Sequence, residues 1–108
     1  MTPDDGASSA IDAIWRSSRG EIGRRISTVE EAVCALRSQR LDDGLRGRAL
    51  CDAHKLTGAL GMFGFTNGSV LSRELEQGLE LRGEAAHGAG PQLTALVHTL
   101  RREFDARA

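Results

Sequence analysis

Apolar residues recur at spacings of three and four along most of the chain, which is the period of an amphipathic helix. No segment alternates apolar and polar positions for long enough to predict a strand. The first apolar stripe consists of Ile11, Ile14, Trp15, Ile22, Ile26, Val29, Val33 and Leu36. It is interrupted at Ser17-Ser18-Arg19-Gly20, so the pattern fits one long helix or two, with Trp15 as a core anchor. Residues 1–9 are small and acidic and are expected to form a flexible N-terminal tail.

A second helix is expected over residues 43–62, after the short connection Leu41-Asp42-Asp43-Gly44. Asp42 or Asp43 is suited to cap it, because a carboxylate accepts hydrogen bonds from the free N–H groups of the first turn. One side of this helix is apolar and is expected to be buried through Leu45, Ala49, Ala53, Leu56, Leu60 and Phe63. His54 projects from the opposite side. Met62 and Phe63 are expected to close the end of the core.

Two further helices complete the pattern. Gly64-Phe65-Thr66-Asn67 is typical of a turn with Thr66 or Asn67 as N-cap, and the next helix is expected to bury Val70, Leu71, Leu75, Leu79 and Leu81. Residues 83–90 hold three glycines and predict a flexible connection, so that Pro91 begins the last helix. That helix has apolar positions at Leu93, Leu96, Val97, Leu100 and Phe104. We therefore predict an all-α fold, an antiparallel up-and-down four-helix bundle over residues 10–108 with a long or broken N-terminal helix.

Three glycines share the face of the second helix from which His54 projects. At 100° per residue, Gly58 lies about 40° to one side of His54 and Gly61 about 20° to the other, and Gly47 falls on the same face. Glycine inside a helix costs about 1 kcal/mol relative to alanine, so this face has a reason to be bare. The glycines could allow close packing of another helix or access by a partner protein. Their alignment with His54 rather than with the leucines favours access.

The segment Ala53-His54-Lys55-Leu56-Thr57-Gly58-Ala59-Leu60-Gly61-Met62-Phe63-Gly64 resembles the signature of histidine-containing phosphotransfer (HPt) domains. Leu75-Glu76 is similar to the Leu-Glu pair of the next helix in that family, and the resemblance spans roughly residues 10 to 105. It implies that His54 accepts a phosphoryl group, on Nε2. The group would then pass between aspartates of receiver domains, or from a hybrid sensor kinase to a response regulator.

The resemblance also implies roles for residues around the histidine. Glu76 is the candidate acceptor for a hydrogen bond from the other ring nitrogen, which would fix the tautomer. Many members carry lysine three residues after the histidine, where this chain has Thr57, and Lys55 is the candidate for the missing cation. The partner-binding face would comprise Gly47, Leu50, Cys51, Thr57, Gly58 and Gly61. Glu76 and Lys55 each have a simpler interpretation as solvated helix-surface residues.

A receiver domain presents an acidic pocket that holds Mg²⁺, so basic residues around the histidine are expected to steer its docking. The candidates are Lys55, Arg48, Arg46 and Arg73. No cofactor is expected to bind this chain tightly, and the Mg²⁺ would come with the receiver partner. Such a chain would be a stoichiometric phosphohistidine carrier rather than an enzyme, because it lacks a nucleotide-binding module. The competing hypothesis is a helical adaptor that binds receivers without carrying phosphate, and Thr57 keeps it open.

Composition narrows the function classes. The 108 residues argue for one domain, and the net charge of −1 gives no reason to expect nucleic acid or an anionic membrane as partner. No signal sequence or long apolar run is present, so we expect a cytoplasmic, monomeric protein with Cys34 and Cys51 reduced. Cys51 and His54 lie one helical turn apart, but nothing in the spacing of His87 or His98 adds further metal ligands. A Cys-His nucleophile pair would also lack its orienting group.

Overall fold

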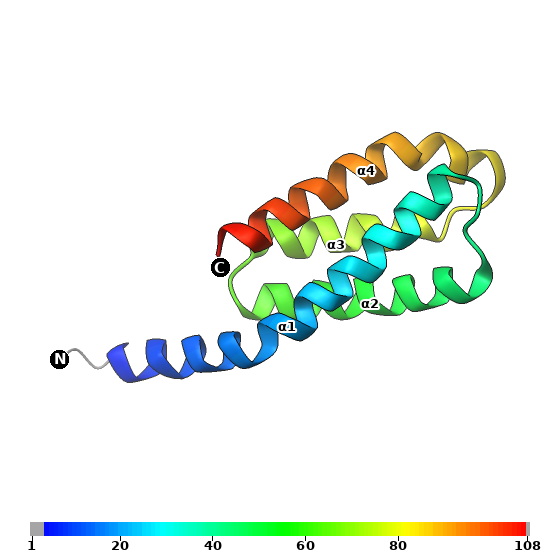
Figure 1. The fold of residues 1–108 in the computed structure, drawn as a ribbon. Helices are drawn as coiled ribbons and strands as arrows, with labels where there is room; N and C mark the ends of the chain where they lie inside the picture. The colour runs from blue at the N-terminus through cyan, green and yellow to red at the C-terminus, as the bar shows by residue number, and fades with distance from the viewer. Residues whose placement is uncertain (1–3, 108) are drawn as a thin grey trace.

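The computed structural model describes the backbone of residues 4–107 and the side chains of residues 10–107. Within these residues it contains four helices, α1 (Asp4–Arg37), α2 (Asp43–Met62), α3 (Thr66–Leu79) and α4 (Gly83–Ala106), joined by short connections. Successive helices run in opposite directions and pack on one another, and α4 returns to pack on α1 (Figure 1). The predicted all-α, antiparallel up-and-down bundle is therefore confirmed, and α2 and α4 lie diagonally opposite each other.

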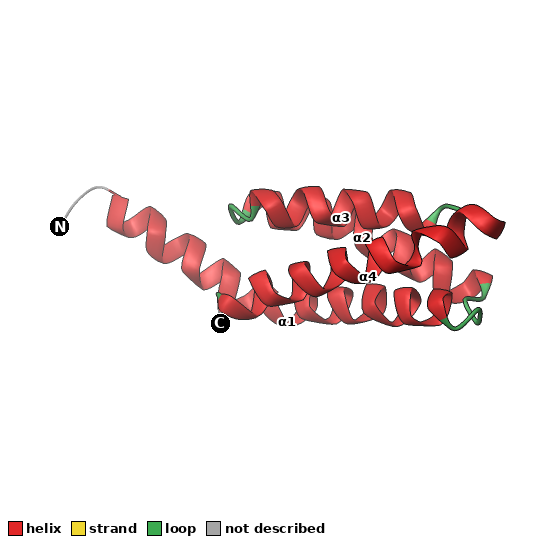
Figure 2. Ribbon diagram, turned by 90° about the horizontal axis from the view of Figure 1, so that it is seen from above, coloured by secondary structure: helices red, strands yellow, loops and turns green. Residues whose placement is uncertain are grey.

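The first helix is continuous, so the break considered at residues 17–20 does not occur. It begins at Asp4, within the predicted tail, because extending an existing helix adds one hydrogen bond for each residue that it orders. Residues 1–3 of that predicted tail lie outside the described residues. The first turns of α1 project beyond the other helices (Figure 2). Ile11 and Ile14 are consequently about half exposed, although the apolar stripe placed them in the core.

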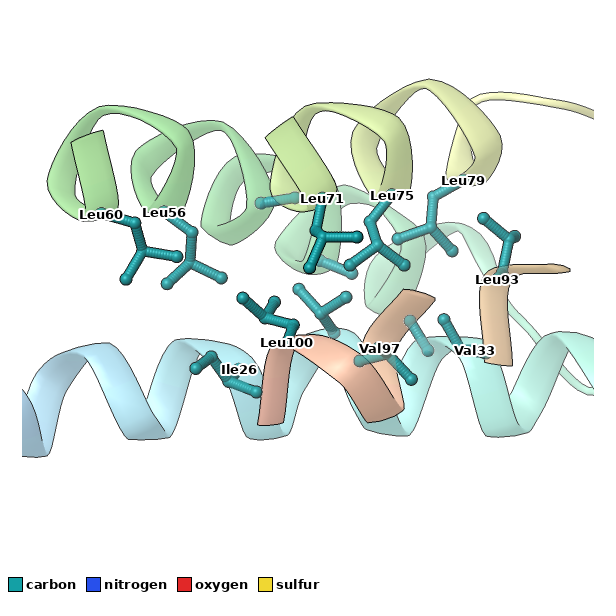
Figure 3. Close-up of a cluster of buried hydrophobic side chains, with 14 of the residues drawn as sticks. Ile26, Val33, Leu56, Leu60, Leu71, Leu75, Leu79, Leu93, Val97 and Leu100 are labelled. Atoms are coloured by element: carbon teal, nitrogen blue, oxygen red, sulfur yellow. The ribbon is translucent and has the colours of Figure 1, made fainter. Parts of the chain in front are cut away.

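The second helix has the predicted bounds and the predicted buried side. Asp42 is the N-cap, and its side chain accepts a hydrogen bond from the backbone N–H of Leu45 at 2.7 Å. Apolar side chains of all four helices meet along the axis of the bundle (Figure 3). The side chains that α2 contributes to this core are those of Leu45, Ala49, Ala53, Leu56 and Leu60, with Phe63 just beyond its end. Burial of that side turns the opposite side of α2 toward solvent.

Three predictions for the third helix are wrong. Phe65 rather than Thr66 or Asn67 occupies the N-cap position, and the Asn67 side chain instead donates to Glu103 on α4 at 2.7 Å. Val70 is half exposed, since it lies about 100° from Leu71 around the helix and so outside the buried side. Leu81 is also exposed, because it follows the end of α3. The predicted leucines at positions 71, 75 and 79 are buried, together with Gly68, Ser72 and Gly78.

The fourth helix begins eight residues before Pro91, at Gly83, so the flexible connection predicted over residues 83–90 is wrong. Pro91 lies inside the helix rather than at its start. Tertiary packing compensates for the weak helix propensity of this segment. Ala86 and Gly90 are both buried, and a Cβ atom on Gly90 would lie 3.4 Å from Cγ of Arg37 on α1.

An aromatic cluster closes the end of the bundle from which α1 projects. The ring of Trp15 contacts those of Phe63 and Phe104, with centroids 5.2 and 5.8 Å apart, which confirms Trp15 as an anchor. Arg107 stacks over the Trp15 ring at 4.7 Å and donates a hydrogen bond to the carbonyl of Phe63 at 2.6 Å. Met62 was expected to take part, but it is 70% exposed because it lies on the outer side of α2.

A partly buried ion pair joins the first and last helices. Arg101 on α4 donates to the carboxylate of Glu30 on α1 at 2.8 and 3.2 Å. This hydrogen bond is the main reason why the pKa of Arg101 is raised above its ordinary value, and the nearby charge of Asp105 adds to it. The guanidinium therefore stays charged at any pH at which the domain would act, and it ties α1 to α4 on the side of the bundle away from His54.

Candidate functional site

His54 lies in the middle of α2 with its side chain 80% exposed. Its Nδ1 atom is 3.2 and 3.3 Å from the two carboxylate oxygens of Glu76 on α3, and the Glu76 side chain is 24% exposed. A carboxylate only accepts hydrogen bonds, so this contact places the ring hydrogen on Nδ1. In the neutral ring Nε2 is then the unprotonated nitrogen of a highly exposed side chain.

Two of the three glycines on this face border open space. A Cβ atom added to Gly47 or Gly58 would meet nothing within 4 Å. Close helix packing therefore does not explain these two glycines. Gly61 differs, because a Cβ there would lie 3.6 Å from Oγ of Ser69 on α3, an ordinary contact distance. It borders both the open surface and the interface with α3.

The other predicted partner-binding residues surround His54 in different ways. Leu50 is half buried and packs against the core, while Cys51 is exposed as a free thiol. Thr57 is half buried, and its hydroxyl donates to the carbonyl of Ala53 in the preceding turn at 3.1 Å. Thr57 therefore contributes no charge and no free donor to the exposed face. Position 57 is therefore electrically neutral in this chain.

Four basic residues were expected to surround the histidine, and three of them are exposed: Arg48, Lys55 and Arg73. Lys55 also lines a groove of 340 Å³ between α1 and α2, next to the exposed Met62. The prediction for Arg46 is wrong, because its side chain is buried and its guanidinium donates to the backbone carbonyls of Leu79 and Leu81. Arg46 satisfies the free carbonyls at the end of α3 and leaves no charge at the surface for docking.

Sequence reasoning missed two links that hold α2 in place. Asp52 accepts a hydrogen bond from Arg25 on α1 at 2.8 Å, and both side chains are largely buried. Ser69 donates from its hydroxyl to the carbonyl of Thr57 at 2.6 Å. The only sequence signal for Ser69 is its position seven residues before Glu76, which places both on one side of α3. Nothing in the periodicity pointed to a bond with α2.

The residues weighed as further metal ligands do not gather around Cys51 and His54. His87 and His98 are on α4, diagonally across the bundle from α2. Among the side chains of residues 10–107, no three of the His, Cys, Asp or Glu type lie close enough together to hold a metal ion. The same part of the chain contains no helix that is both long and apolar enough to cross a membrane.

Fold and site together define a helical-bundle protein that presents one histidine, paired with a glutamate, on an open face of its second helix. Residues 13–106 match the family model described as the Hpt domain, and the chain belongs to this family. Hpt domains serve in phosphotransfer in two-component phosphorelays, where they interact with receiver domains and kinases. Neither the curated proteins nor the solved structures gave a significant match to the chain.

Proposed function

We propose that the chain is a phosphorelay intermediate that accepts and donates a phosphoryl group on Nε2 of His54. The observation that carries the proposal is the contact between Nδ1 of His54 and Glu76, because it leaves Nε2 unprotonated on a highly exposed ring. The partners would be receiver domains of response regulators, a hybrid sensor histidine kinase, or both. We also propose that the protein is monomeric and cytoplasmic.

In the proposed reaction, the lone pair of Nε2 attacks the phosphorus of a receiver's aspartyl phosphate in line with the leaving oxygen. The N–P bond forms as the O–P bond breaks, and the aspartate leaves as a carboxylate. The ring becomes positively charged because Nδ1 keeps its hydrogen, and the Glu76 carboxylate at 3.2 Å offsets this charge. The reverse transfer uses the same contacts. Most of the rate would come from positioning and from charge supplied by the partner.

The remaining face fits docking by a partner that brings its own chemistry. Gly47, Gly58 and Gly61 leave space around the ring, and Leu50 and Cys51 place apolar groups beside it. Lys55 is the exposed cation next to His54 in the chain, so it is our candidate to complement an acidic receiver pocket. Thr57 would contact the partner without adding charge. Mg²⁺ would arrive with the receiver, and this chain would act as a stoichiometric carrier rather than as an enzyme.

The test is to incubate the purified domain with a phosphorylated receiver and Mg²⁺ and to record its intact mass. The His54→Gln variant is the matched control, because glutamine retains helix propensity and removes the imidazole. A phosphate adduct on the wild type alone, stable in base and lost in acid, supports the carrier. If the domain binds receivers but gains no adduct from a panel of them or from phosphoramidate, the result would instead indicate a helical adaptor. The neutral Thr57 is compatible with that alternative.

A further inference from the structure

Two cross-helix bonds link α3 to α2, one on each side of the contact between His54 and Glu76. On one side, the Ser69 hydroxyl donates to the carbonyl of Thr57 at 2.6 Å. On the other side, the buried Arg46 guanidinium donates to the carbonyl of Leu79, the last residue of α3, and to that of Leu81 just beyond the helix at 2.8 Å. Because the helices are antiparallel, the three contacts follow one another along a single seam. His54 and Glu76 therefore lie between the Ser69 bond and the Arg46 bonds.

The Ser69 bond uses acceptor capacity that an ordinary helix leaves free. A helix carbonyl accepts one hydrogen bond from the residue four positions later and has a second lone pair. The carbonyl of Thr57 directs this second site toward α3, and Ser69 fills it. Gly61, one turn further along α2, borders this bond, and a Cβ atom there would lie at an ordinary contact distance of 3.6 Å from Oγ of Ser69. The Ser69 bond therefore does not depend on the glycine.

Small displacements of α3 would be enough to break the contact with His54. The distances of 3.2 and 3.3 Å are already at the long end for a hydrogen bond. A glutamate carboxylate lies about 6 Å from its helix axis, so a rotation of α3 by about 10° moves it by about 1 Å. Ser69 precedes Glu76 by two turns on the same side of α3, where it directly opposes such a rotation.

We propose that Ser69 and Arg46 are positioning residues that hold α3 in register with α2 and thereby set the Nδ1–Glu76 contact of His54. The proposal rests on the proposed function for its consequence, since the contact matters for transfer only if His54 carries phosphate. Neither residue touches the reacting nitrogen. Both act through Glu76, Ser69 from the N-terminal end of α3 and Arg46 from its C-terminal end.

The test compares Ser69→Ala with Ser72→Ala. Ser72 belongs to the same helix and is fully buried, but its hydroxyl donates to the carbonyl of Gly68 within α3, so its loss leaves the link to α2 intact. Long-range ¹⁵N NMR on the neutral imidazole gives the proportion of the Nδ1–H tautomer of His54. We expect Ser69→Ala to lower the ratio of this tautomer to the Nε2–H form about threefold, and Ser72→Ala to leave it unchanged.

A second measurement asks whether Ser69 acts through Glu76. The rate of phosphorylation by phosphoramidate, a small donor that needs no docking surface, is expected to fall about threefold in Ser69→Ala. In a Glu76→Ala background the same substitution is expected to have no further effect, because the group that it positions is gone. An unchanged tautomer ratio in Ser69→Ala, or an equal loss of rate in the Glu76→Ala background, would overturn the inference.

Arg46 provides an independent arm of the experiment. Arg46→Met keeps an unbranched apolar side chain in place of the arginine stem and removes the donors, so it is expected to shift the tautomer ratio in the same direction as Ser69→Ala. Arg46→Lys retains an ammonium group that can donate to the carbonyls of Leu79 and Leu81 but lacks the fork of the guanidinium, so it is expected to restore part of the ratio. The two proposals remain distinguishable. A wild type that takes no phosphate contradicts the function, whereas the NMR comparison still decides the positioning.

Discussion

Substitutions at Gly58 are expected to have opposite effects on the stability of the free domain and on its docking to a receiver. Its position is inside α2, one turn after His54, and an added Cβ would meet nothing within 4 Å. Gly58→Ala should therefore stabilise the isolated domain, because alanine removes the entropic penalty of a helical glycine without any clash. The same substitution places a methyl group about 40° from His54, on the face that a receiver would cover.

The expected gain is close to the full difference in helix propensity. Gly→Ala in an exposed helix interior contributes about 1 kcal/mol, and no term from packing opposes it at Gly58. For a domain of about 100 residues, this gain raises Tm by about 4–8 °C. Gly58→Gln is also expected to stabilise the fold, since glutamine is a good helix former, but its longer side chain would obstruct the imidazole. Transfer from a receiver should then fall on the order of tenfold, which is a loss of about 1.4 kcal/mol.

The assay pairs thermal unfolding, followed by circular dichroism, with two phosphoryl donors. A phosphorylated receiver tests docking, and phosphoramidate tests the chemistry of the imidazole alone. The matched control is Gly20→Ala on α1, where an added Cβ also meets nothing within 4 Å. Gly20→Ala should raise Tm by a similar amount and leave both donors unaffected.

The reasoning would be refuted by either of two results. If Gly58→Ala fails to raise Tm while Gly20→Ala does so, the glycine face of α2 has a structural requirement that the open space around it does not reveal. If Gly58→Gln transfers phosphate from the receiver at the wild-type rate, the partner does not need this face bare. An equal loss with receiver and phosphoramidate would mean that the substitution damages the imidazole rather than docking.

Three further predictions concern stability, each measured by urea denaturation. Gly78→Ala should destabilise the fold by about 1–3 kcal/mol despite its better helix propensity, since the new Cβ would clash with the side chain of Leu93, and an unchanged midpoint would contradict this packing. Trp15→Ala should cost about 3–5 kcal/mol, whereas Ile14→Ala, in the exposed projecting turns, should cost much less. Arg107→Ala removes two aromatic contacts and a hydrogen bond to a backbone carbonyl, so a loss of about 1–2 kcal/mol is expected, and no loss would show that the terminus does not close the cluster.

Local signals in the sequence were sufficient for much of the fold. The periodicity of α2 predicted its bounds and its buried side, and Asp42 was among the expected caps. The glycine face and the family signature selected His54 and Glu76, which the fold brings to 3.2 Å. The predicted bounds, buried side and cap of α2 are confirmed because helix period and capping act over a few residues at a time.

The same local rules failed where contacts distant in sequence decided the outcome. Residues 83–90 have the composition of a loop, yet they are helical because Ala86 and Gly90 pack against the rest of the bundle. Ile11 and Ile14 belong to the apolar stripe of the first helix, yet they are exposed because α1 extends beyond its neighbours. Arginine is usually a surface residue, but Arg46 is buried because its guanidinium donates to the carbonyls of Leu79 and Leu81 at the end of α3.

The sequence by itself determined the helical fold class and the face of the second helix from which His54 projects. Each depends only on residue types and on a fixed angle per residue. Only the tertiary structure decided where the Glu76 carboxylate lies across the seam between α2 and α3, and its position against Nδ1 gives the physical reason for the free Nε2 that the resemblance implied. It also decided the register of that seam, through the bonds made by Ser69 and Arg46. A helical pattern specifies which side of a helix is buried, but the sliding and rotation of one helix against another are settled by the side chains that meet between them.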